Sequence, residues 1–305
     1  MSQPSLLNLP LGLVTNPTSG KGRGAAHAET VRRQLAQAGV EFLELTAADY
    51  ETALSRSKQA VNDRRIGGLI VVGGDGMAHL GVNACAQTPV PLGVVPAGTG
   101  NDSATTLGMP AEVSAAVATI LEHRERPVAV DLIRARSASH EFWSLGTVSA
   151  GFDALVNRRA NLMRYPKGAS RYPVAMVAEL ASFRGIKYRA TVDGVEREIE
   201  AMLCAVANSP AFGGGMKIVP EASITDGLLD LFIVHKISRA TLLKIFPKVY
   251  TGEHVTHPAV EIVRAKSVTL DSGDLPAYAD GEAVGTSPLT ASVVPGALQV
   301  FAPPR

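Results

Sequence analysis

The strongest constraint on the fold is a regular alternation of short apolar runs and helical patterns over residues 11–123. Each apolar run is short enough for a strand, and each is followed by a stretch with helical periodicity. Such alternation predicts a parallel sheet covered by helices on both faces. In chain order the expected pairs are Leu11–Thr15 with Ala25–Ala38, Phe42–Leu45 with Tyr50–Asn62, Leu69–Val72 with Met77–Ala86, and Gly93–Val95 with Asp102–Leu107, and the helix Ala111–His123 closes the series.

The pattern changes after Pro127, where strand-length apolar runs follow one another with only two helical stretches, Tyr172–Phe183 and Ser238–Tyr250. Turn signals separate several of these runs, and the dipeptide Asp193-Gly194 between two of them is typical of a β-hairpin. This part therefore predicts a mostly antiparallel β-sandwich. The expected strands are Val128–Ile133, Phe142–Val148, Tyr188–Val192, Ile199–Val206, Leu228–Val234, Val260–Val263 and Ser267–Leu270.

The length of the chain agrees with two domains. A chain of 305 residues exceeds what one hydrophobic core usually serves. We predict an α/β domain with an open parallel sheet over residues 1–130 and a mostly antiparallel β-sandwich over residues 131–288. The last apolar runs, Leu289–Val294 and Leu298–Phe301, are predicted as strands that carry residues 289–305 back to the first domain.

Charge and composition exclude several classes of function. The 29 lysines and arginines nearly balance the 28 aspartates and glutamates and form no long basic run, so we expect no nucleic-acid partner. Cys85 and Cys204 stand alone in apolar stretches, which predicts buried thiols in a reducing, cytoplasmic setting. No apolar run approaches the ~20 residues that cross a bilayer, so any membrane contact should be peripheral and reversible. We interpret His254 and His257 as solvated loop residues rather than zinc ligands.

Three loops rich in glycine and polar residues follow three of the predicted strands. They are Asn16-Pro17-Thr18-Ser19-Gly20, Gly73-Gly74-Asp75-Gly76 and Gly98-Thr99-Gly100-Asn101-Asp102. Because the carboxyl ends of parallel strands meet at one edge of a sheet, the loops should share its ligand-binding edge. Glycines let the backbone approach a phosphate, and a following helix offers N–H groups and a positive dipole end. The Gly-Gly-Asp-Gly loop alone fits a plain turn equally well, but three such loops together favour a phosphate site.

Taken together, the three loops resemble the diacylglycerol kinase catalytic-domain family, which includes bacterial lipid kinases and sphingosine kinases. Later segments resemble further landmarks of that family, so the resemblance covers nearly the whole chain: Gly151-Phe152-Asp153-Ala154, Gly213-Gly214-Gly215-Met216, Pro220-Glu221-Ala222, Asp226-Gly227-Leu228 and Ala279-Asp280-Gly281-Glu282. One departure is Met77, where the family usually has threonine. The resemblance implies an NAD kinase/phosphofructokinase-like first domain that binds nucleotide and an ATP- and Mg²⁺-dependent phosphoryl transfer to a lipid hydroxyl.

The resemblance also implies catalytic roles. Asp75, Asp102 and Asp131 would form a carboxylate and water network around a catalytic Mg²⁺. Asp280 would be the general base that receives the proton of the lipid hydroxyl, with Glu282 nearby. From the pattern alone, Asp280-Gly281 is more readily interpreted as a hairpin turn, so the base role depends on the resemblance. Carboxylates for Mg²⁺ and backbone donors for phosphate suit phosphoryl transfer.

Nucleotide-binding and structural-metal residues follow from the same resemblance. Those implied to hold the nucleotide are Asn16, Ser19, Gly20, Thr46, Gly73, Gly74, Gly76, Gly98, Thr99, Gly100 and Asn101. A second, structural Mg²⁺ would lie at Ser223, Asp226 and Leu228, where the first and last would contribute main-chain oxygens.

Residues 157–183 are the best candidate for a lipid entrance, because they are rich in Leu, Met, Tyr and Arg. Methionines and aromatic residues could line a cleft for an acyl chain, while arginines could meet anionic headgroups. Core packing with a solvated face would explain the same composition. Leu162 and Met163 are the residues on which we expect the lipid requirement to depend.

The leading expectation is a membrane lipid substrate, diacylglycerol, converted to phosphatidic acid. Kinases of a sphingoid base, ceramide, polyprenol or glycolipid stay open as alternatives, because pocket shape rather than motif spelling separates them. An NAD kinase shares the Gly-Gly-Asp-Gly loop, but the loops at 16–20 and 98–102 tell against it. Met77 leaves open a catalytically silent nucleotide- or lipid-sensing module. The oligomeric state is also open, with a homodimer as one option.

Overall fold

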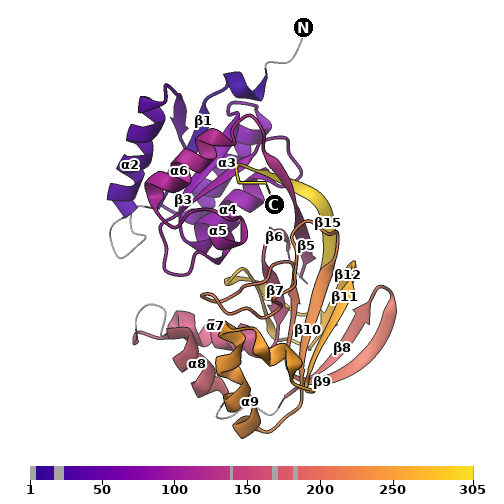
Figure 1. Ribbon diagram of the computed structural model, residues 1–305. Helices are drawn as coiled ribbons and strands as arrows, with labels where there is room; N and C mark the ends of the chain where they lie inside the picture. Colours follow the sequence, from indigo (N-terminus) through magenta and orange to yellow (C-terminus); the bar gives the residue numbers. More distant parts are fainter. Residues whose placement is uncertain (1–4, 17–23, 138–139, 167–170, 181–184, 305) are drawn as a thin grey trace. The chain divides into compact units, whose positions relative to one another are not determined.

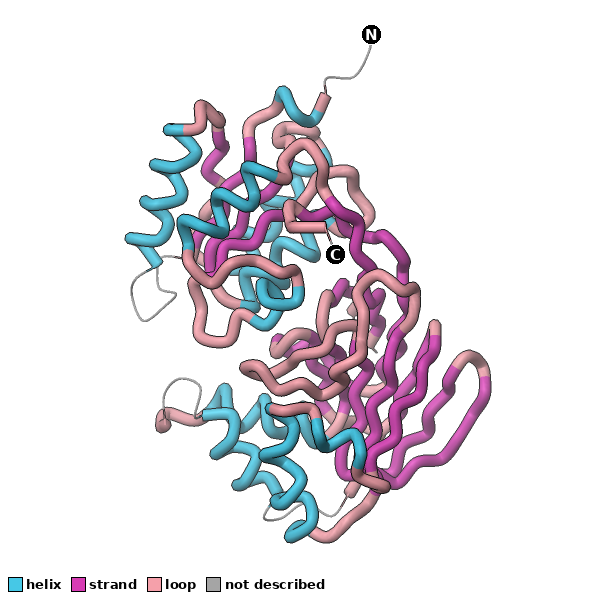
Figure 2. The backbone as a smooth tube through the Cα atoms, viewed as in Figure 1, coloured by secondary structure: helices cyan, strands magenta, loops and turns pink. Residues whose placement is uncertain are grey.

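The chain forms two compact units in a computed structural model that describes residues 5–16, 24–137, 140–166, 171–180 and 185–304 (Figure 1). One unit comprises Met1–Val130 together with Gly296–Arg305, and the other comprises Asp131–Pro295. Helices are concentrated in the first unit and strands in the second (Figure 2).

Parallel strands form the sheet of the first unit. They are β1 (Leu11–Thr15), β2 (Phe42–Glu44), β3 (Gly68–Gly73) and β4 (Leu92–Pro96), in the order β4-β3-β1-β2. Every residue of β1, β3 and β4 is buried, as expected for strands covered on both faces. The end of the last strand, β15 (Leu289–Val300), joins this sheet where Val300 pairs in parallel with Leu92. The predicted parallel sheet is confirmed.

The helices of the first unit follow its strands along the chain. They are α2 (Gly24–Gln37), α3 (Tyr50–Asn62), α4 (Asp75–Cys85), α5 (Asp102–Thr106) and α6 (Val113–Glu122), and a 3-10 turn, η1 (Leu6–Asn8), precedes β1. Helix α2 packs against α6, and α3 packs against α4. Side-chain caps fix two of the starts, since Asp49 accepts the N–H of Thr52 before α3 and Glu112 accepts that of Ala115 before α6.

The second unit is built mainly from antiparallel strands. They are β5 (Val128–Arg136), β6 (Glu141–Ser144), β7 (Thr147–Ala150), β8 (Ile186–Val192), β9 (Val195–Ala207), β10 (Leu229–His235), β11 (Val260–Ala265), β12 (Ser267–Asp271), β13 (Pro276–Ala279) and β14 (Glu282–Thr286). Their order is β14-β13-β7-β9-β8-β12-β15, and β10 pairs with both β9 and β11. The predicted hairpin at Asp193-Gly194 joins β8 to β9, and φ angles of 47° and 87° suit its two-residue turn.

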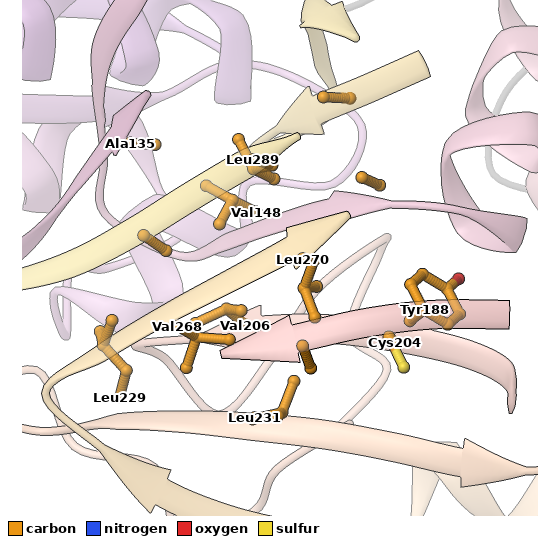
Figure 3. Close-up of a cluster of buried hydrophobic side chains, with 14 of the residues drawn as sticks. Ala135, Val148, Tyr188, Cys204, Val206, Leu229, Leu231, Val268, Leu270 and Leu289 are labelled. Atoms are coloured by element: carbon orange, nitrogen blue, oxygen red, sulfur yellow. The ribbon is translucent and has the colours of Figure 1, made fainter. Parts of the chain in front are cut away.

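Two clusters of buried side chains form the core of the second unit. The first lies among the strands, and Figure 3 shows Tyr188, Val206, Leu231, Leu270 and Leu289 from five different strands within it. The second lies between strands and helices, which are α7 (Phe152–Leu162), α8 (Arg171–Leu180), α9 (Arg239–Ile245), η3 (Phe246–Tyr250) and η4 (Glu253–Thr256). Cys204 belongs to the first cluster, and both cysteines are free and buried, as predicted.

Three elements differ from the predictions. The single strand expected over Phe142–Val148 is interrupted between β6 and β7, at Leu145 and Gly146. The helix expected over Ser238–Tyr250 changes to 3-10 geometry at Phe246, because Pro247 has no N–H to continue the α-helical bonds. The two final strands are one continuous strand, β15. Helix α7 and the hairpin β13–β14 were not among the predicted elements.

Candidate active site

The loop after β3 turns directly into helix α4. Gly74 is the N-cap of α4, and Met77, in the first turn, folds its side chain over Gly73, so that a Cβ on Gly73 would lie 2.4 Å from the Met77 Cγ. Met77 is therefore a packing residue here, with 9% of its surface exposed. The first N–H groups of an α-helix have no partner within the helix, so this loop presents backbone donors at the carboxyl end of the sheet.

The loop after β4 lies against the loop after β3. A Cβ on Gly98 would lie 2.4 Å from the Gly74 Cα, so the two backbones touch where neither residue has a side chain. Asn101 stabilises its own loop, because its side-chain oxygen accepts the Gly98 N–H at 2.9 Å. Asn101 itself has a φ of 60°, in the left-handed region that asparagine tolerates. The glycines at 74 and 98 are thus required by contact between the loops.

Asp75 connects these two loops. One of its carboxylate oxygens accepts the N–H of Asn101 at 2.9 Å, and the other accepts the N–H of Ser103 at 2.9 Å. Both donors belong to the start of helix α5, whose positive end favours a carboxylate. Asp102, the first residue of α5, is half-buried beside them. Asp75 therefore connects the loop after β3 to the loop after β4. Asp75 and Asp102 both belong to the first unit.

The other predicted nucleotide residues occupy the same sheet edge or lie outside the described residues. Asn16 follows β1 and donates its N–H to the Val72 carbonyl at 3.1 Å. The Thr46 hydroxyl, after β2, accepts the Thr15 N–H at 3.0 Å and donates to Glu44 at 2.6 Å. Gly76 is half-buried, whereas Thr99 and Gly100 are exposed. Ser19 and Gly20 lie outside the described residues.

Asp131 belongs to the second unit, and its hydrogen bonds lie there. Its carboxylate accepts the N–H of Gly227 at 2.8 Å, and its own N–H donates to the Ile224 carbonyl at 2.7 Å. With 4% of its surface exposed, it is buried, as is Asp230. These bonds fix the β5 start to the turn before β10.

Asp280 occupies the first position of the two-residue turn between β13 and β14. Its φ of 49° and the 88° of Gly281 match the turn type that Asp-Gly favours. Its carboxylate accepts three main-chain N–H groups, from Leu145 at 3.1 Å, Gly146 at 2.9 Å and Thr147 at 3.0 Å. The hairpin turn that the pattern predicts is therefore present, and the same aspartate holds the loop between β6 and β7.

Glu282 differs from Asp280 in its surroundings. Its side chain is exposed, at the first position of β14. Among the described residues it makes no side-chain hydrogen bond or ion pair. A carboxylate of this kind keeps its lone pairs available for a substrate proton.

The predicted structural-metal residues lie in the turn before β10, and their side chains contact other residues of the protein. Asp226 pairs with the Arg264 guanidinium and also accepts the N–H of Leu228 at 3.1 Å, so its charge is already neutralised. The Ser223 hydroxyl bonds to that of Thr225 at 3.2 Å. Across the described ranges, no group of three or more His, Cys, Asp or Glu residues is placed to hold an ion. The Mg²⁺ site implied at residues 223–228 stays a prediction, because these side-chain contacts do not test main-chain oxygens as ligands.

An apolar pocket lies in the second unit, between strands β9 and β10 and the helices. Its walls include Phe152 of α7, Met176 of α8, Phe212, Met216, Phe246 of η3 and His254 of η4. The cavity between these walls is small, with a volume of about 60 Å³. The composition of this lining suits hydrocarbon.

His254 is the polar exception in the wall of that pocket. It is 1% exposed, so our interpretation of it as a solvated loop residue was wrong. Its Nε2 lies 3.0 Å from the Ile218 carbonyl, and its ring packs edge-on against Phe232. Burial lowers the pKa of His254, because the interior disfavours the charged imidazolium.

The segment predicted as a lipid entrance combines buried and exposed apolar side chains. Met176 lines the pocket, whereas Leu162 and Tyr165 are 78% and 76% exposed, and Val174 and Val177 on α8 are also exposed. Arg158 and Arg164 are exposed in the same segment. Exposed apolar side chains with neighbouring arginines are suited to contact with an anionic lipid surface. Every helix in the described part of the chain is too short or too polar to span a membrane.

Sequence reasoning missed two parts of this site. The loop Leu145–Thr147 was assigned to a strand, although the glycine at 146 was a signal for an interruption. The pocket residues Phe212 and Phe246 were not singled out, because they come from segments far apart in the sequence. Only the folded chain brings them together.

Comparisons with known proteins agree with this arrangement of two units. Residues 10–133 match the diacylglycerol kinase catalytic domain, and residues 146–302 match the YegS C-terminal NAD kinase beta sandwich-like domain. A Mycobacterium tuberculosis protein named diacylglycerol kinase is 38% identical over 293 residues, covering 95% of this chain and 94% of that protein. A Staphylococcus carnosus diacylglycerol kinase is 30% identical over 295 residues, covering 95% of this chain and 94% of that protein.

A solved structure shares the fold. The crystal structure of a diacylglycerol kinase from Bacillus anthracis superposes with a TM-score of 0.73 at 20% identity and covers 97% of both chains. At that identity the likeness shows the fold alone, an α/β unit followed by an antiparallel β unit. The sequence matches extend over both units, and on that basis this chain belongs to the diacylglycerol kinase family of lipid kinases.

Proposed function

We propose that this enzyme transfers the γ-phosphoryl group of ATP to the hydroxyl of diacylglycerol and so produces phosphatidic acid. The observation that carries the proposal is the 38% identity, over 95% of the chain, to a relative named diacylglycerol kinase. The contacting loops after β3 and β4 and the apolar pocket of the second unit support it, since the reaction needs a phosphate site and a place for hydrocarbon.

The first unit would hold the nucleotide. Backbone N–H groups at the start of α4 and the loop around Gly98 suit phosphate oxygens, and Asn16 and Thr46 lie after neighbouring strands of the same sheet. Mg²⁺ usually binds one or two carboxylates together with substrate phosphates and water. Asp75 and Asp102, both in the first unit, are hard oxygen ligands of that type and are our candidates to hold it, and the implied part of Asp131 stays a prediction. Bound there, the ion would neutralise charge on the transferring group.

The hairpin Asp280-Gly281-Glu282 would supply the general base. In the reaction, the lipid oxygen bonds to the γ-phosphorus, the bond to the β-phosphate oxygen breaks, and the hydroxyl proton passes to a carboxylate. The implied role of Asp280 stays a prediction. The hydrogen bonds favour different roles for the two carboxylates, because Asp280 already accepts three N–H groups whereas Glu282 is exposed. We therefore propose Glu282 as the stronger candidate for the base and Asp280 as the group that holds the turn.

A transfer assay tests the proposed activity directly. Purified protein with labelled ATP and Mg²⁺ should phosphorylate diacylglycerol in mixed micelles and leave NAD unlabelled. The NAD arm addresses the second domain, whose matched family is described as NAD kinase-like. Transfer to ceramide, a sphingoid base, a polyprenol or a glycolipid in preference to diacylglycerol would reassign the substrate. Absence of transfer to every lipid would favour a sensing module.

The exposed apolar residues between α7 and α8 would contact the membrane. Replacing Leu162 and Tyr165 with aspartate should weaken binding to anionic vesicles, because both side chains are more than three-quarters exposed in the native fold. The matched control is Val195→Asp, since Val195 is 68% exposed on a distant hairpin of the same unit. Activity on a short-chain, water-soluble diacylglycerol should survive in all three variants. Equal vesicle binding by the variants and the wild type would contradict this surface.

A further inference from the structure

The loop Leu145–Thr147, whose N–H groups bind Asp280, is also hydrogen-bonded to a buried asparagine, Asn208. Asn208 directly follows β9 and is 0% exposed. Its side-chain nitrogen donates to the Leu145 carbonyl at 2.9 Å, and its main-chain N–H donates to the Gly146 carbonyl at 2.7 Å. Asp280 accepts the N–H groups of Gly146 and Thr147.

These bonds place Asn208 and Asp280 on opposite sides of the same two peptide groups. In a trans peptide the carbonyl of one residue and the N–H of the next point in opposite directions. Asn208 takes the carbonyl and Asp280 takes the N–H of the Leu145–Gly146 peptide and again of the Gly146–Thr147 peptide. A shift of Asn208 must therefore move the donors that hold Asp280.

The same side chain also reaches Asp131. The second hydrogen of its amide nitrogen donates to the Asp131 carbonyl at 3.0 Å. Because both partners are carbonyl oxygens, the nitrogen must face them, and a residue with two N–H donors on one atom is required. Aspartate offers none in its charged form, and serine offers one. One buried amide thus connects two of the acidic residues on which the proposed function depends.

We propose that Asn208 is a positioning residue, which sets the location of Asp131 and, through the Leu145–Thr147 loop, of the Asp280 hairpin that carries Glu282. This inference rests on the proposed function for its catalytic meaning. Its structural part stands alone, since it states which residue holds the loop. Gly146 is needed for the same contact between the loop and Asp280. A Cβ at this position would lie 2.8 Å from the Asp280 Oδ1 and would push the carboxylate from its donors.

The test compares Asn208→Asp with Ser287→Ala. Ser287 is a matched control, since it is 4% exposed and its hydroxyl also makes two main-chain bonds, to Leu270 and Ser272, in the same unit. Hydrogen–deuterium exchange over residues 143–148 measures the loop, and kcat and the dissociation constant for ATP measure its consequence. Asn208→Ser, which keeps one donor, serves if the aspartate variant does not fold.

We expect faster exchange of the loop amides in Asn208→Asp, a fall in kcat of about 10²-fold and unchanged affinity for ATP. Asn208→Ser should lie between this variant and the wild type, and Ser287→Ala should keep both loop protection and kcat even where its melting temperature falls equally. Wild-type loop exchange in the folded Asn208 variants would overturn the inference, and so would faster exchange with unchanged kcat. If the wild type phosphorylates no lipid, the proposed function fails, and the exchange result alone decides whether Asn208 holds the loop.

Discussion

Asp75 and Asp280 hold their loops in the same way, but the two units assemble this arrangement differently. Each aspartate accepts main-chain N–H groups from a loop remote in the sequence. For Asp75 the donors follow the next strand of a parallel sheet, 26 and 28 residues away. For Asp280 they lie 133 to 135 residues away and arrive through the antiparallel pairing of β7 with β13.

An aspartate in a recognisable motif can therefore have a positional role. Hydrogen bonds from several N–H groups occupy part of a carboxylate's lone pairs and favour its charged form, which makes it a weaker proton acceptor. These bonds also fix neighbouring residues. In the first unit these are the loops after β3 and β4, and in the second unit they include Glu282.

The largest effect is expected for Asp280→Asn. Its three charge-assisted bonds are replaced by weaker or mismatched ones, which should lower the free energy of unfolding by about 3 kcal/mol. Urea unfolding measures this change. Glu282→Gln is the control, and it should alter the free energy of unfolding by less than about 0.5 kcal/mol.

The same pair of variants separates the two candidates for the base. If Glu282 is the base, Glu282→Gln abolishes most of kcat with stability intact, whereas Asp280→Asn loses activity together with stability. Full transfer activity in Glu282→Gln would return the base role to Asp280.

A smaller loss is expected for Asp75→Asn, because two N–H bonds are affected instead of three. We expect the free energy of unfolding to fall by about 2 kcal/mol and ATP affinity to weaken, since the loops after β3 and β4 lose their connection. Asp63→Asn, at the exposed end of α3, is the control and should match the wild type. A loss for Asp75→Asn as large as that for Asp280→Asn would break the comparison.

Alanine substitutions at Gly98 and Gly146 compare the cost of a new methyl group against a backbone neighbour with its cost against a side-chain neighbour. Gly98→Ala meets the Gly74 backbone, which cannot rotate away, and should cost about 2 kcal/mol. Gly146→Ala meets the Asp280 carboxylate, which can shift, and should cost about 1 kcal/mol while lowering kcat. Thermal unfolding orders the two variants. A larger loss of stability for Gly146→Ala than for Gly98→Ala would mean that the Asp280 carboxylate cannot shift to accommodate the methyl group.

The smallest effect concerns pH and the second unit. Burial lowers the pKa of His254 in the folded state, so the unfolded chain binds more protons than the folded chain between that lowered value and about 6.5. The contribution of His254 to stability should therefore be fully present above pH ~6.5 and be lost as the pH drops through this window. Urea unfolding at several pH values measures the slope. His254→Gln should flatten it, and an unchanged slope would assign the effect to other groups.

Much of the first unit could be predicted, because each strand and helix of its consecutive strand–helix pairs is determined by residues close together in the sequence. Strands β1, β3 and β4 lie where β-branched runs occur, and Asp49 and Glu112 cap helices within one turn. Gly146 signalled an interruption of the strand, but the contact that fixes the loop at Leu145 could not be predicted in this way. Its N–H bonds to Asp280, and that partner is fixed only by pairing between distant strands.

The sequence by itself determined the alternation of strands and helices, the Asp-Gly turns and the family, because these depend on neighbouring residues or on matched motifs. Tertiary structure decided the roles of the charged residues. It paired Asp226 with Arg264, buried His254 against Phe232, and gave Asp280 three main-chain N–H partners while leaving Glu282 exposed. The physical reason is that a carboxylate's chemistry depends on which donors surround it, and here those donors come from remote segments.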